Sequence, residues 1–331
     1  MRVESYEVGG EVTALAADAD RLYVGTEHSV SAFEYGAADS AWDTAAPAHQ
    51  VAIGENVVVA AGANEASAFA MDGTEQWRLQ AASDNEATGL LVDERTAYVG
   101  FQYGLEAVAV ASGRRRWSLS TDDNAVPGFD GDRLLVGDDV TAYAPRGALG
   151  GVLADAPVRE WTCPEVVGPV RPVVTSEYVL AGTSVCHWSG RCGLHAVAGG
   201  DHEYHVELGD SAGQVATDGD RAYVVSMQYG ESEGGYNLAD TTTLHAIDVA
   251  TGERRWSFQR LGWFTAPVVA DGTVYVGDPD TRNGNGNLHA LDAASGDLLW
   301  EVTDVDGVTE LAAVGDSLFV GESDGRVSQF R

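Results

Sequence analysis

The chain has 331 residues and a formal net charge of −32 at pH 7, and all 19 of its basic residues are arginines. Nucleic-acid binding depends on a basic stripe that contacts phosphates, and so acidic a chain without such a stripe excludes that partner. Segments rich in Val, Ala and Gly, without a long helical period, exclude an α-helical fold and predict an all-β protein.

The acidic residues are spread along the whole chain, and we interpret them as a solvated surface. A charge excess of this kind is a device of halophiles, because molar salt shortens repulsion to about 3 Å. We therefore expect a halophilic archaeon as the host. Residues 1–8 run directly into a predicted strand, and no apolar signal or transmembrane stretch is seen, so we expect a cytoplasmic monomer without membrane insertion.

A pattern of two apolar strands recurs about every 40 residues along the chain. The second strand usually ends in glycine, and the aligned positions are Gly25, Gly62, Gly100, Gly137, Gly182, Val225, Gly277 and Gly321. Short strands at this period are typical of propeller blades, as in architectures of the WD40 type. We predict one domain over residues 1–331, an eight-bladed β-propeller of four-stranded antiparallel blades.

The two ends of the chain complete each other in this repeat. The last unit offers three strands and lacks an outer one, whereas residues 3–8 supply a strand that belongs to no other unit. Pairing the ends within one blade removes the open edges that an unclosed sheet would expose. We therefore predict that blade 8 consists of residues 308–331 together with residues 1–8.

Several repeats end in a shared motif. Residues 247–256 read Ile-Asp-Val-Ala-Thr-Gly-Glu-Arg-Arg-Trp, and residues 110–117 and 293–300 end in a similar way. The motif resembles the tryptophan-docking repeat of PQQ-like quinoproteins, in which the indole of the outer strand wedges between blades. The resemblance implies a packing role for the aromatic residues at the repeat ends, which are Trp42, Trp77, Trp117, Trp161, Tyr204, Trp256 and Trp300.

Three histidines also share one repeat position. His195, His245 and His289 each lie in a Leu-His-Ala segment. A common position in the repeat favours a common structural place over three separate ligands.

Adjacent repeats five, six and seven have lengthened second hairpins, at residues 184–193, 228–242 and 279–287. With strands A to D from the channel outward, the B–C hairpins and D–A connections share one face, called here the top face. Binding residues favour loops on a rigid scaffold, so we hypothesise a binding face over blades 5–7. Free tolerance of insertions at hairpin tips is the alternative.

Aromatic and arginine residues outside the packing positions fall on this predicted face. They are Trp188, Arg191, Tyr229, Tyr236, Arg260, Trp263 and Phe264. Aromatic residues together with arginine are typical of interaction hot spots. Burial of the aromatic rings against neighbouring loops is the alternative interpretation.

Two metal sites come into question in the same region. Zn²⁺ would suit the thiolate and imidazole groups of Cys163, Cys186, His187 and Cys192. Their spacing matches no zinc module, however. Buried free thiols and a Cys186–Cys192 disulfide are therefore the alternative interpretations. Asp278 and Asp280 begin a segment similar to a Ca²⁺ loop. Arg282 in its fifth place and the missing Glu at the twelfth favour a flexible hairpin instead.

The resemblance to quinoproteins raises the hypothesis of a PQQ-dependent oxidoreductase. The adjacent cysteines and the Asp base of those enzymes have no counterpart in this sequence, so we do not expect PQQ or an enzyme. We favour a non-catalytic scaffold that presents the top face of blades 5–7 to a protein or peptide partner, similar in blade type to bacterial lipoproteins that scaffold outer-membrane assembly. The alternative is a small-molecule or metal-ion binding protein that uses the mouth of the central channel, where Arg171 on a predicted inner strand would meet an anion.

Overall fold

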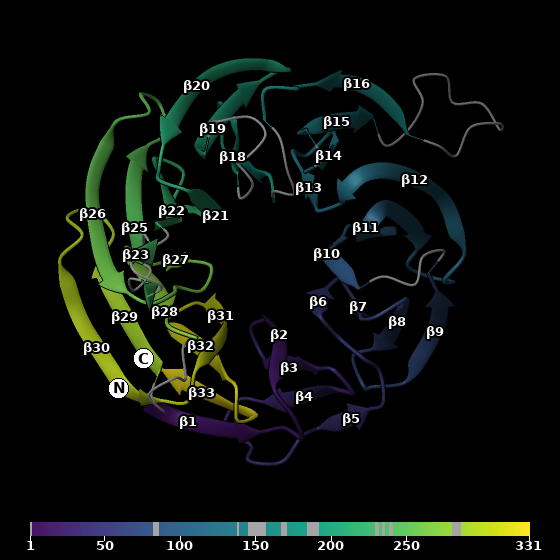
Figure 1. Cartoon of the computed structure of the whole chain (residues 1–331). Helices are drawn as coiled ribbons and strands as arrows, with labels where there is room; N and C mark the ends of the chain where they lie inside the picture. Colours follow the sequence, from purple (N-terminus) through teal and green to yellow (C-terminus); the bar gives the residue numbers. More distant parts are fainter. Residues whose placement is uncertain are drawn as a thin grey trace.

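Small antiparallel β-sheets stand as blades around a central opening (Figure 1). The computed structural model describes residues 2–81, 86–137, 139–144, 157–166, 171–183, 192–228, 232–233, 236–237, 241–279 and 286–331. Every regular element within these residues is a β-strand, and they contain no helix long and apolar enough to cross a membrane. The predicted eight-bladed, all-β propeller is confirmed.

The first four blades follow the chain from the channel to the rim. Blade 1 consists of β2 (Val12–Ala17), β3 (Arg21–Thr26), β4 (Val30–Glu34) and β5 (Trp42–Thr44). Blade 2 consists of β6 (Gln50–Ile53), β7 (Val57–Ala61), β8 (Glu65–Ala70) and β9 (Glu75–Gln80). Blade 3 consists of β10 (Ala87–Val92), β11 (Thr96–Ala109) and β12 (Arg115–Asn124). Blade 4 consists of β13 (Pro127–Phe129), β14 (Leu134–Val136), β15 (Thr141–Ala144) and β16 (Val158–Thr162).

The next three blades repeat the order. Blade 5 consists of β17 (Val173–Val174), β18 (Val179–Gly182), β19 (Gly193–Ala198) and β20 (Asp201–Glu207). Blade 6 consists of β21 (Ser211–Thr217), β22 (Arg221–Gln228), β25 (Thr241–Asp248) and β26 (Arg254–Leu261). Blade 7 consists of β27 (Val268–Ala270), β28 (Thr273–Gly277), β29 (Gly286–Asp292) and β30 (Leu298–Val305). A separate two-stranded pair, β23 (Ser232–Glu233) with β24 (Tyr236–Asn237), lies in the chain between β22 and β25.

Blade 3 has the same four-strand layout although β11 is one continuous element. The chain folds back on itself at Tyr103, whose φ is 66°. Val110 N donates to Arg95 O at 3.0 Å, so the two ends of β11 lie side by side. The two halves of β11 therefore serve as strands B and C, between β10 and β12.

Blade 8 is closed by strands from both ends of the chain. β31 (Val308–Val314), β32 (Ser317–Glu322) and β33 (Arg326–Phe330) supply its inner three strands, and β1 (Arg2–Glu7) pairs antiparallel with β33. Tyr6 lies opposite Val327, is buried, and packs its ring 5.2 Å from that of Phe33 in blade 1. β1 thus completes the ring and also joins blade 8 to blade 1 (Figure 1).

The repeat glycines allow neighbouring blades to approach closely. A Cβ on Gly100 would stand 1.7 Å from Ala125 O in the next blade, and one on Gly182 would stand 2.1 Å from Gly213 O. Any side chain at these positions would push the inner strand of the next blade away from the blade that carries the glycine. The Val-Gly strand ends of the sequence therefore set the spacing between blades.

The aromatic residues at the repeat ends hold each blade to the following one, as the resemblance implied. Trp42 Nε1 donates to Met71 O at 3.1 Å, and Trp256 Nε1 donates to Ala293 O at 3.1 Å. Tyr204, which replaces Trp in blade 5, makes the same contact through its hydroxyl. The hydrophobic clusters also lie between adjacent blades, so each blade buries its faces against its neighbours.

Candidate functional site

The top side of blades 6 and 7 carries a packed group of rings, which we call the aromatic shelf: Phe258, Phe264 and His289. Phe258 on β26 and Phe264, which follows that strand, stack with centroids 6.1 Å apart and planes at 12°. The His289 ring on β29 meets both edge-on, at 5.4 and 5.6 Å. Three mutually packed rings from two blades give the shelf little freedom to move.

Arg260 lies over this shelf. Its Cζ is 3.9 Å from the centroid of the Phe258 ring, and its Nη1 donates to Gln259 O at 2.9 Å. A guanidinium in this position is attracted by the ring quadrupole, and such a contact contributes about 0.5–1 kcal/mol at an exposed site. The side chain is thereby held in place while its charge stays exposed.

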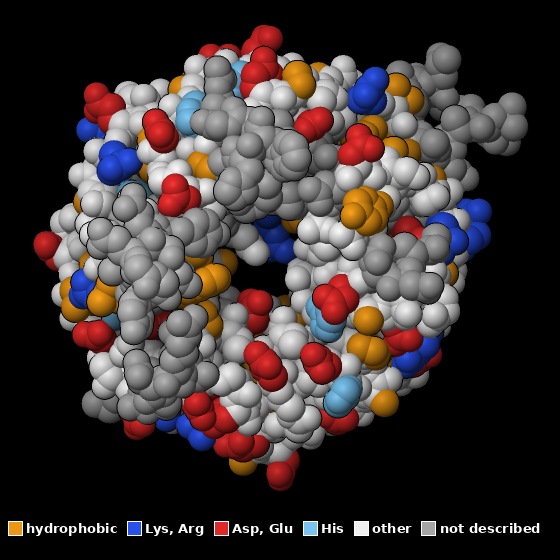
Figure 2. Space-filling view, in the orientation of Figure 1, with side chains coloured by type: hydrophobic (Ala, Val, Ile, Leu, Met, Phe, Trp, Pro, Cys, Tyr) orange, Lys and Arg blue, Asp and Glu red, His pale blue; other side chains and the backbone are white. Residues whose placement is uncertain are grey.

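Two large apolar side chains project from the same segment. Leu261 is 68% exposed and Trp263 is 40% exposed. Gly262 between them has φ 106°, and its carbonyl accepts a hydrogen bond from Thr242 Oγ1, which fixes this turn. Figure 2 shows hydrophobic side chains at the left border of the ring opening, on the side of blades 6 and 7.

The structure separates the residues predicted for the binding face over blades 5–7. Phe264 packs against the hydrophobic cluster shared by blades 6 and 7, whereas Trp263 next to it faces solvent. Tyr236 lies in β24, but its side chain is outside the described residues. Trp188, Arg191 and Tyr229 also lie outside the described residues.

The central channel holds Arg171, the eighth predicted binding residue. Arg171 lies two residues before β17 rather than on an inner strand, which corrects the sequence-based placement. Its Nη2 donates to Gln50 Oε1 at 3.1 Å, and Gln50 begins the inner strand of blade 2. The side chain therefore links blade 5 to blade 2.

The cysteines are divided between two states. Cys192 is disulfide-bonded, so its sulfur is not a thiolate that could bind zinc. Cys163 is a buried free thiol whose Sγ donates to Glu165 Oε2 at 3.5 Å. Burial and that carboxylate raise the pKa of Cys163 to about 11, which opposes the thiolate that a metal would need. Cys186 and His187 lie outside the described residues.

The calcium hypothesis rests largely on a segment outside the described residues, which includes Asp280 and Arg282. Asp278 N donates to Asn287 O at 2.7 Å, and Asp278 O accepts from Val308 N at 3.0 Å. The backbone of Asp278 thus belongs to the base of a hairpin and to the contact with blade 8. Among the described residues, no group of three or more His, Cys, Asp or Glu side chains could hold a metal ion.

The histidines of the repeat lie buried on equivalent strands. His195, His245 and His289 are on β19, β25 and β29, and burial lowers the pKa of His245 to about 4. Sequence analysis did not find the surroundings of His195, whose Nδ1 lies 3.0 Å from His202 Nε2 and whose ring stacks on His205. The strand register, which places His195 opposite His205, is the signal that could have revealed this cluster.

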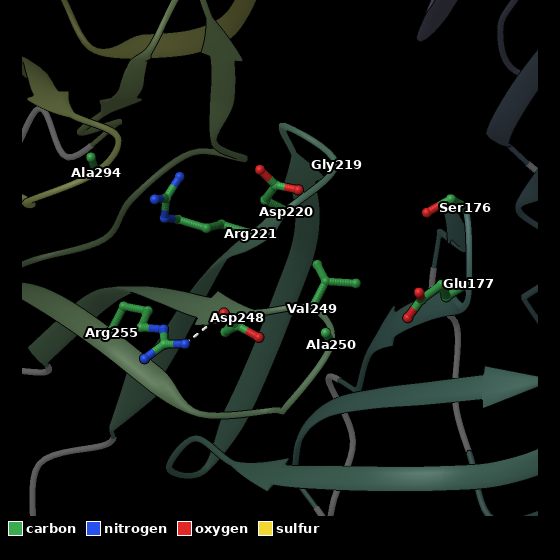
Figure 3. Close-up of a pocket in the computed structure, with 10 residues that line it drawn as sticks. All are labelled: Ser176, Glu177, Gly219, Asp220, Arg221, Asp248, Val249, Ala250, Arg255 and Ala294. Carbon is green, nitrogen blue, oxygen red and sulfur yellow. Dashed lines mark hydrogen bonds and ion pairs between the residues drawn. The ribbon is translucent and has the colours of Figure 1, made fainter.

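A hollow of about 450 Å³ lies on the opposite, bottom face between blades 5 and 6 (Figure 3). Arg255 Nη2 and Asp248 Oδ2 are 2.7 Å apart there, and Arg221 Nη1 and Asp218 Oδ2 are 3.3 Å apart. Tyr223, on the adjoining strand, donates its hydroxyl to Asp218 at 2.7 Å. The arginines of this hollow already have carboxylate partners.

The arrangement at the bottom hollow recurs in other blades. Tyr23 donates to Asp18 in blade 1 and Tyr98 donates to Asp93 in blade 3. Asp18 lines one similar hollow, and Asp93 and Tyr98 line another. The Asp residue also accepts from the backbone N–H groups two and three residues later, which builds the tight A–B turn. A feature that the repeat reproduces belongs to the construction of a blade, so the bottom hollow is a poor candidate for a specific site.

The closed ring with docked tryptophans defines the class of protein, an eight-bladed propeller of the quinoprotein-type repeat. The family described as outer membrane protein assembly factor BamB matches residues 2–197 and 188–331, and the chain belongs to that family. No curated protein sequence matches the chain.

Three solved structures show the same fold at low identity. BamB from Moraxella catarrhalis is 20% identical with a TM-score of 0.73, over 99% of this chain and 96% of that one. Sqt1 from Saccharomyces cerevisiae is 12% identical with a TM-score of 0.77, over 99% and 98%. Quinohemoprotein alcohol dehydrogenase from Comamonas testosteroni is 14% identical with a TM-score of 0.67, over 100% and 76%.

Proposed function

We propose that this propeller is a non-catalytic scaffold that presents the top side of blades 5–7 to a protein or peptide partner. The observation that carries the proposal is the exposure of Leu261 and Trp263 beside a fixed arginine, Arg260, on the aromatic shelf. Exposed apolar groups next to arginine on a rigid base have the composition of a binding hot spot. We call these three residues the partner face.

Rigidity of the shelf supports this assignment. Phe258 and Phe264 are stacked and Arg260 lies over Phe258, so this arginine is already ordered before a partner arrives. Preorganised side chains lose less conformational entropy on binding, which leaves more of the contact energy as affinity. The family is that of an outer membrane protein assembly factor, and assembly factors work by binding other proteins, which also supports the proposal.

The chemistry of the partner follows from the partner face. Trp263 and Leu261 favour an apolar side chain, and the guanidinium of Arg260 favours a neighbouring carboxylate. We therefore expect a peptide segment that combines apolar and acidic residues. A strongly basic partner would be attracted by the general acidic surface instead, and its binding would fall steeply with salt.

Photocrosslinking in the native host tests the proposal. A photoreactive residue replacing Trp263 is expected to crosslink one defined protein, and the same residue replacing Leu299 on β30 is the control, because Leu299 is also exposed, at 52%. Purified partner should then bind the wild-type chain and lose affinity for the Leu261→Ser/Trp263→Ser variant. Equal crosslinking at the two positions would overturn the proposal. So would a partner that binds the Leu261→Ser/Trp263→Ser variant as tightly as it binds the wild-type chain.

A further inference from the structure

The central channel contains a cavity of about 370 Å³ that differs from the hollows of the bottom face. Its walls come from the inner strands of nearly every blade, and its polar lining includes Thr13, His49, Gln50, Arg171, Gln214 and Glu310. Arg171 supplies the guanidinium of the lining and Glu310 supplies its carboxyl group. Figure 2 shows basic atoms inside the opening and acidic atoms at its border.

Arg171 is the basic group of this cavity, and it is held away from bulk water. Burial lowers the pKa of its guanidinium, and the nearby charge of Glu310 opposes that shift. The hydrogen bond that it makes within the described residues goes to the neutral amide of Gln50. A half-buried cation whose hydrogen-bond partner is uncharged has lost part of its hydration without gaining a counter-charge, which favours binding of an anion.

Glu310 on β31 does not neutralise Arg171 by direct contact. Burial raises the pKa of the Glu310 carboxyl to about 7, and the charge of Arg171 limits that rise. Arg171 is the described charge that acts on the Glu310 carboxyl, and it does so through space. The neighbouring Thr309 has a buried hydroxyl without a hydrogen-bond partner among the described residues, which is a further unused polar group in the lining.

The arginines of the channel cavity and of the bottom hollow differ in their partners, and this difference distinguishes a binding site from a structural feature. Arg255 and Arg221 in that hollow each have a carboxylate within 3.3 Å. Arg171 in the channel has an amide partner instead, and it is the one arginine among the described residues that line the cavity. Convergent polar groups in a concave space are typical of small-molecule sites.

We propose that the channel binds a small carboxylate anion, with the guanidinium of Arg171 as the main donor to its oxygens. The planar fork of arginine matches the two oxygens of a carboxylate, and Gln50 and Gln214 offer amide donors from two other blades. The site does not depend on the partner face, since none of the residues Arg260, Leu261 and Trp263 lines the cavity.

Glu310 makes this binding sensitive to pH. Protonated Glu310 is neutral and can donate a hydrogen bond to the anion, whereas ionised Glu310 repels the anion and competes for Arg171. The other titratable groups facing it across the cavity are Arg171 and His49, and His49 Nδ1 lies 3.9 Å from Glu86 Oε2. With a pKa of about 7, Glu310 is mostly protonated at about pH 6 and mostly ionised at about pH 8, so affinity should fall up to about tenfold over this range.

Isothermal titration calorimetry with acetate, malonate and inorganic phosphate, in a constant salt background, tests the site. We expect a carboxylate to bind with one site per chain, and the Arg171→Met variant to bind at least about tenfold more weakly, because a hydrogen bond to a charged group is worth about that factor. Arg255→Met, which removes an arginine of the bottom hollow, is the matched control and should bind as the wild type does.

The Glu310→Gln variant keeps the proposal testable if Arg171→Met fails to fold. It should bind the carboxylate at about pH 8 as tightly as the wild type binds it at about pH 6, with no further pH dependence. Binding of phosphate alone, equal binding by Arg171→Met and wild type, or a Glu310→Gln variant with the wild-type pH profile would each overturn the proposal. Leu261→Ser/Trp263→Ser should bind the carboxylate normally, so failure of this site and failure of the partner face remain distinguishable.

Discussion

Gly296 in blade 7 lies against the indole of Trp256 in blade 6, and a Cβ at residue 296 would stand 2.6 Å from Trp256 Cδ2. The glycine also has φ 75°, a conformation that other residues rarely adopt. The same pairing joins Gly73 to Trp42 and Gly113 to Trp77. The glycine of each such turn and the aromatic ring of the preceding blade are therefore two halves of one contact.

We predict that Trp256→Ala destabilises the protein by about 3 kcal/mol, because it removes a large packed ring and the hydrogen bond to Ala293 O. Gly296→Ala should also destabilise by more than about 1 kcal/mol, since its methyl group would overlap the same ring. Chemical denaturation measures both. The double variant should lose less than the sum, because each change damages one shared contact, and full additivity would contradict the pairing.

Trp263 and Phe264 are neighbours in sequence with opposite surroundings, and their alanine variants should differ accordingly. Trp263→Ala should change the free energy of unfolding by less than about 0.5 kcal/mol, because Trp263 is 40% exposed and belongs to no hydrophobic cluster of the described residues. Phe264→Ala should cost about 2–4 kcal/mol, because it removes a ring from the aromatic shelf. Similar losses for both variants in chemical denaturation would contradict the assignment of Trp263 to the partner face.

Two buried groups should give the stability opposite pH dependences. The pKa of Glu310 is raised from 4.5 to about 7, so the stability that it contributes is complete below about pH 4.5 and is lost as pH rises through 7. The pKa of His245 is lowered from 6.5 to about 4, so its contribution is complete above about pH 6.5 and is lost as pH falls through 4. Each change is on the order of 1–3 kcal/mol.

Substitutions separate these two effects. Glu310→Gln should have a higher free energy of unfolding than the wild type at about pH 8. Its remaining pH dependence should be mainly the fall in stability at acidic pH that His245 causes. His245→Gln should lose part of that acid sensitivity while it retains a donor toward Ser226, whose Oγ lies 2.8 Å from His245 Nε2. Urea denaturation across the pH range measures both, and parallel profiles for the two variants would show that other groups dominate.

The acidic surface should make folding depend on salt. With a net charge of −32, the native chain repels itself unless counterions screen the charges. We predict that the melting temperature rises by tens of degrees between low and molar KCl, which would support a halophilic host. A melting temperature that does not change with salt would exclude this adaptation, and a sucrose series at equal viscosity controls for nonspecific stabilisation.

Thiol chemistry should distinguish the two described cysteines. Cys192 should resist alkylation until a reductant is added, because its sulfur is in a disulfide. Cys163 should react only after unfolding, because it is buried and its pKa is raised to about 11. Peptide mapping of the labelled protein measures both, and labelling of native, unreduced Cys192 would reopen the zinc hypothesis.

The local parts of the fold could be predicted because they repeat. Gly100 and Trp256 recur at fixed places in their units, and each contact that they make involves only the next blade. The position of blade 8 followed from a missing strand at one end of the chain and a surplus strand at the other. The repeat in the sequence was therefore sufficient to predict both the number of blades and the way in which the ring closes.

The candidate sites depended on distances that the sequence does not contain. The sequence predicted Arg171 as an anion contact, which stays a prediction. It could not show that Gln50 and Glu310, from blades 2 and 8, lie in the same cavity, because only the closed ring brings them there. The different surroundings of Trp263 and Phe264 could not be predicted either, since these neighbours in one connection differ only in tertiary contacts: Trp263 is exposed, whereas Phe264 packs against the cluster of blades 6 and 7. Such features lie outside the repeat and require the tertiary structure.

Closure through β1 and β33 has a consequence for how the ring forms. Tyr6 and Val327 are paired although nearly the whole sequence separates them, so their contact closes a very large loop of chain. Contacts of this range form late, because the entropy of loop closure must be overcome before they contribute. Blades 1–7 can assemble from neighbouring contacts, and an eighth blade still missing its rim strand would then be the last and slowest to dock. A variant that weakens β1, such as Tyr6→Ala, should therefore accelerate opening of the ring far more than it slows the assembly of the other blades.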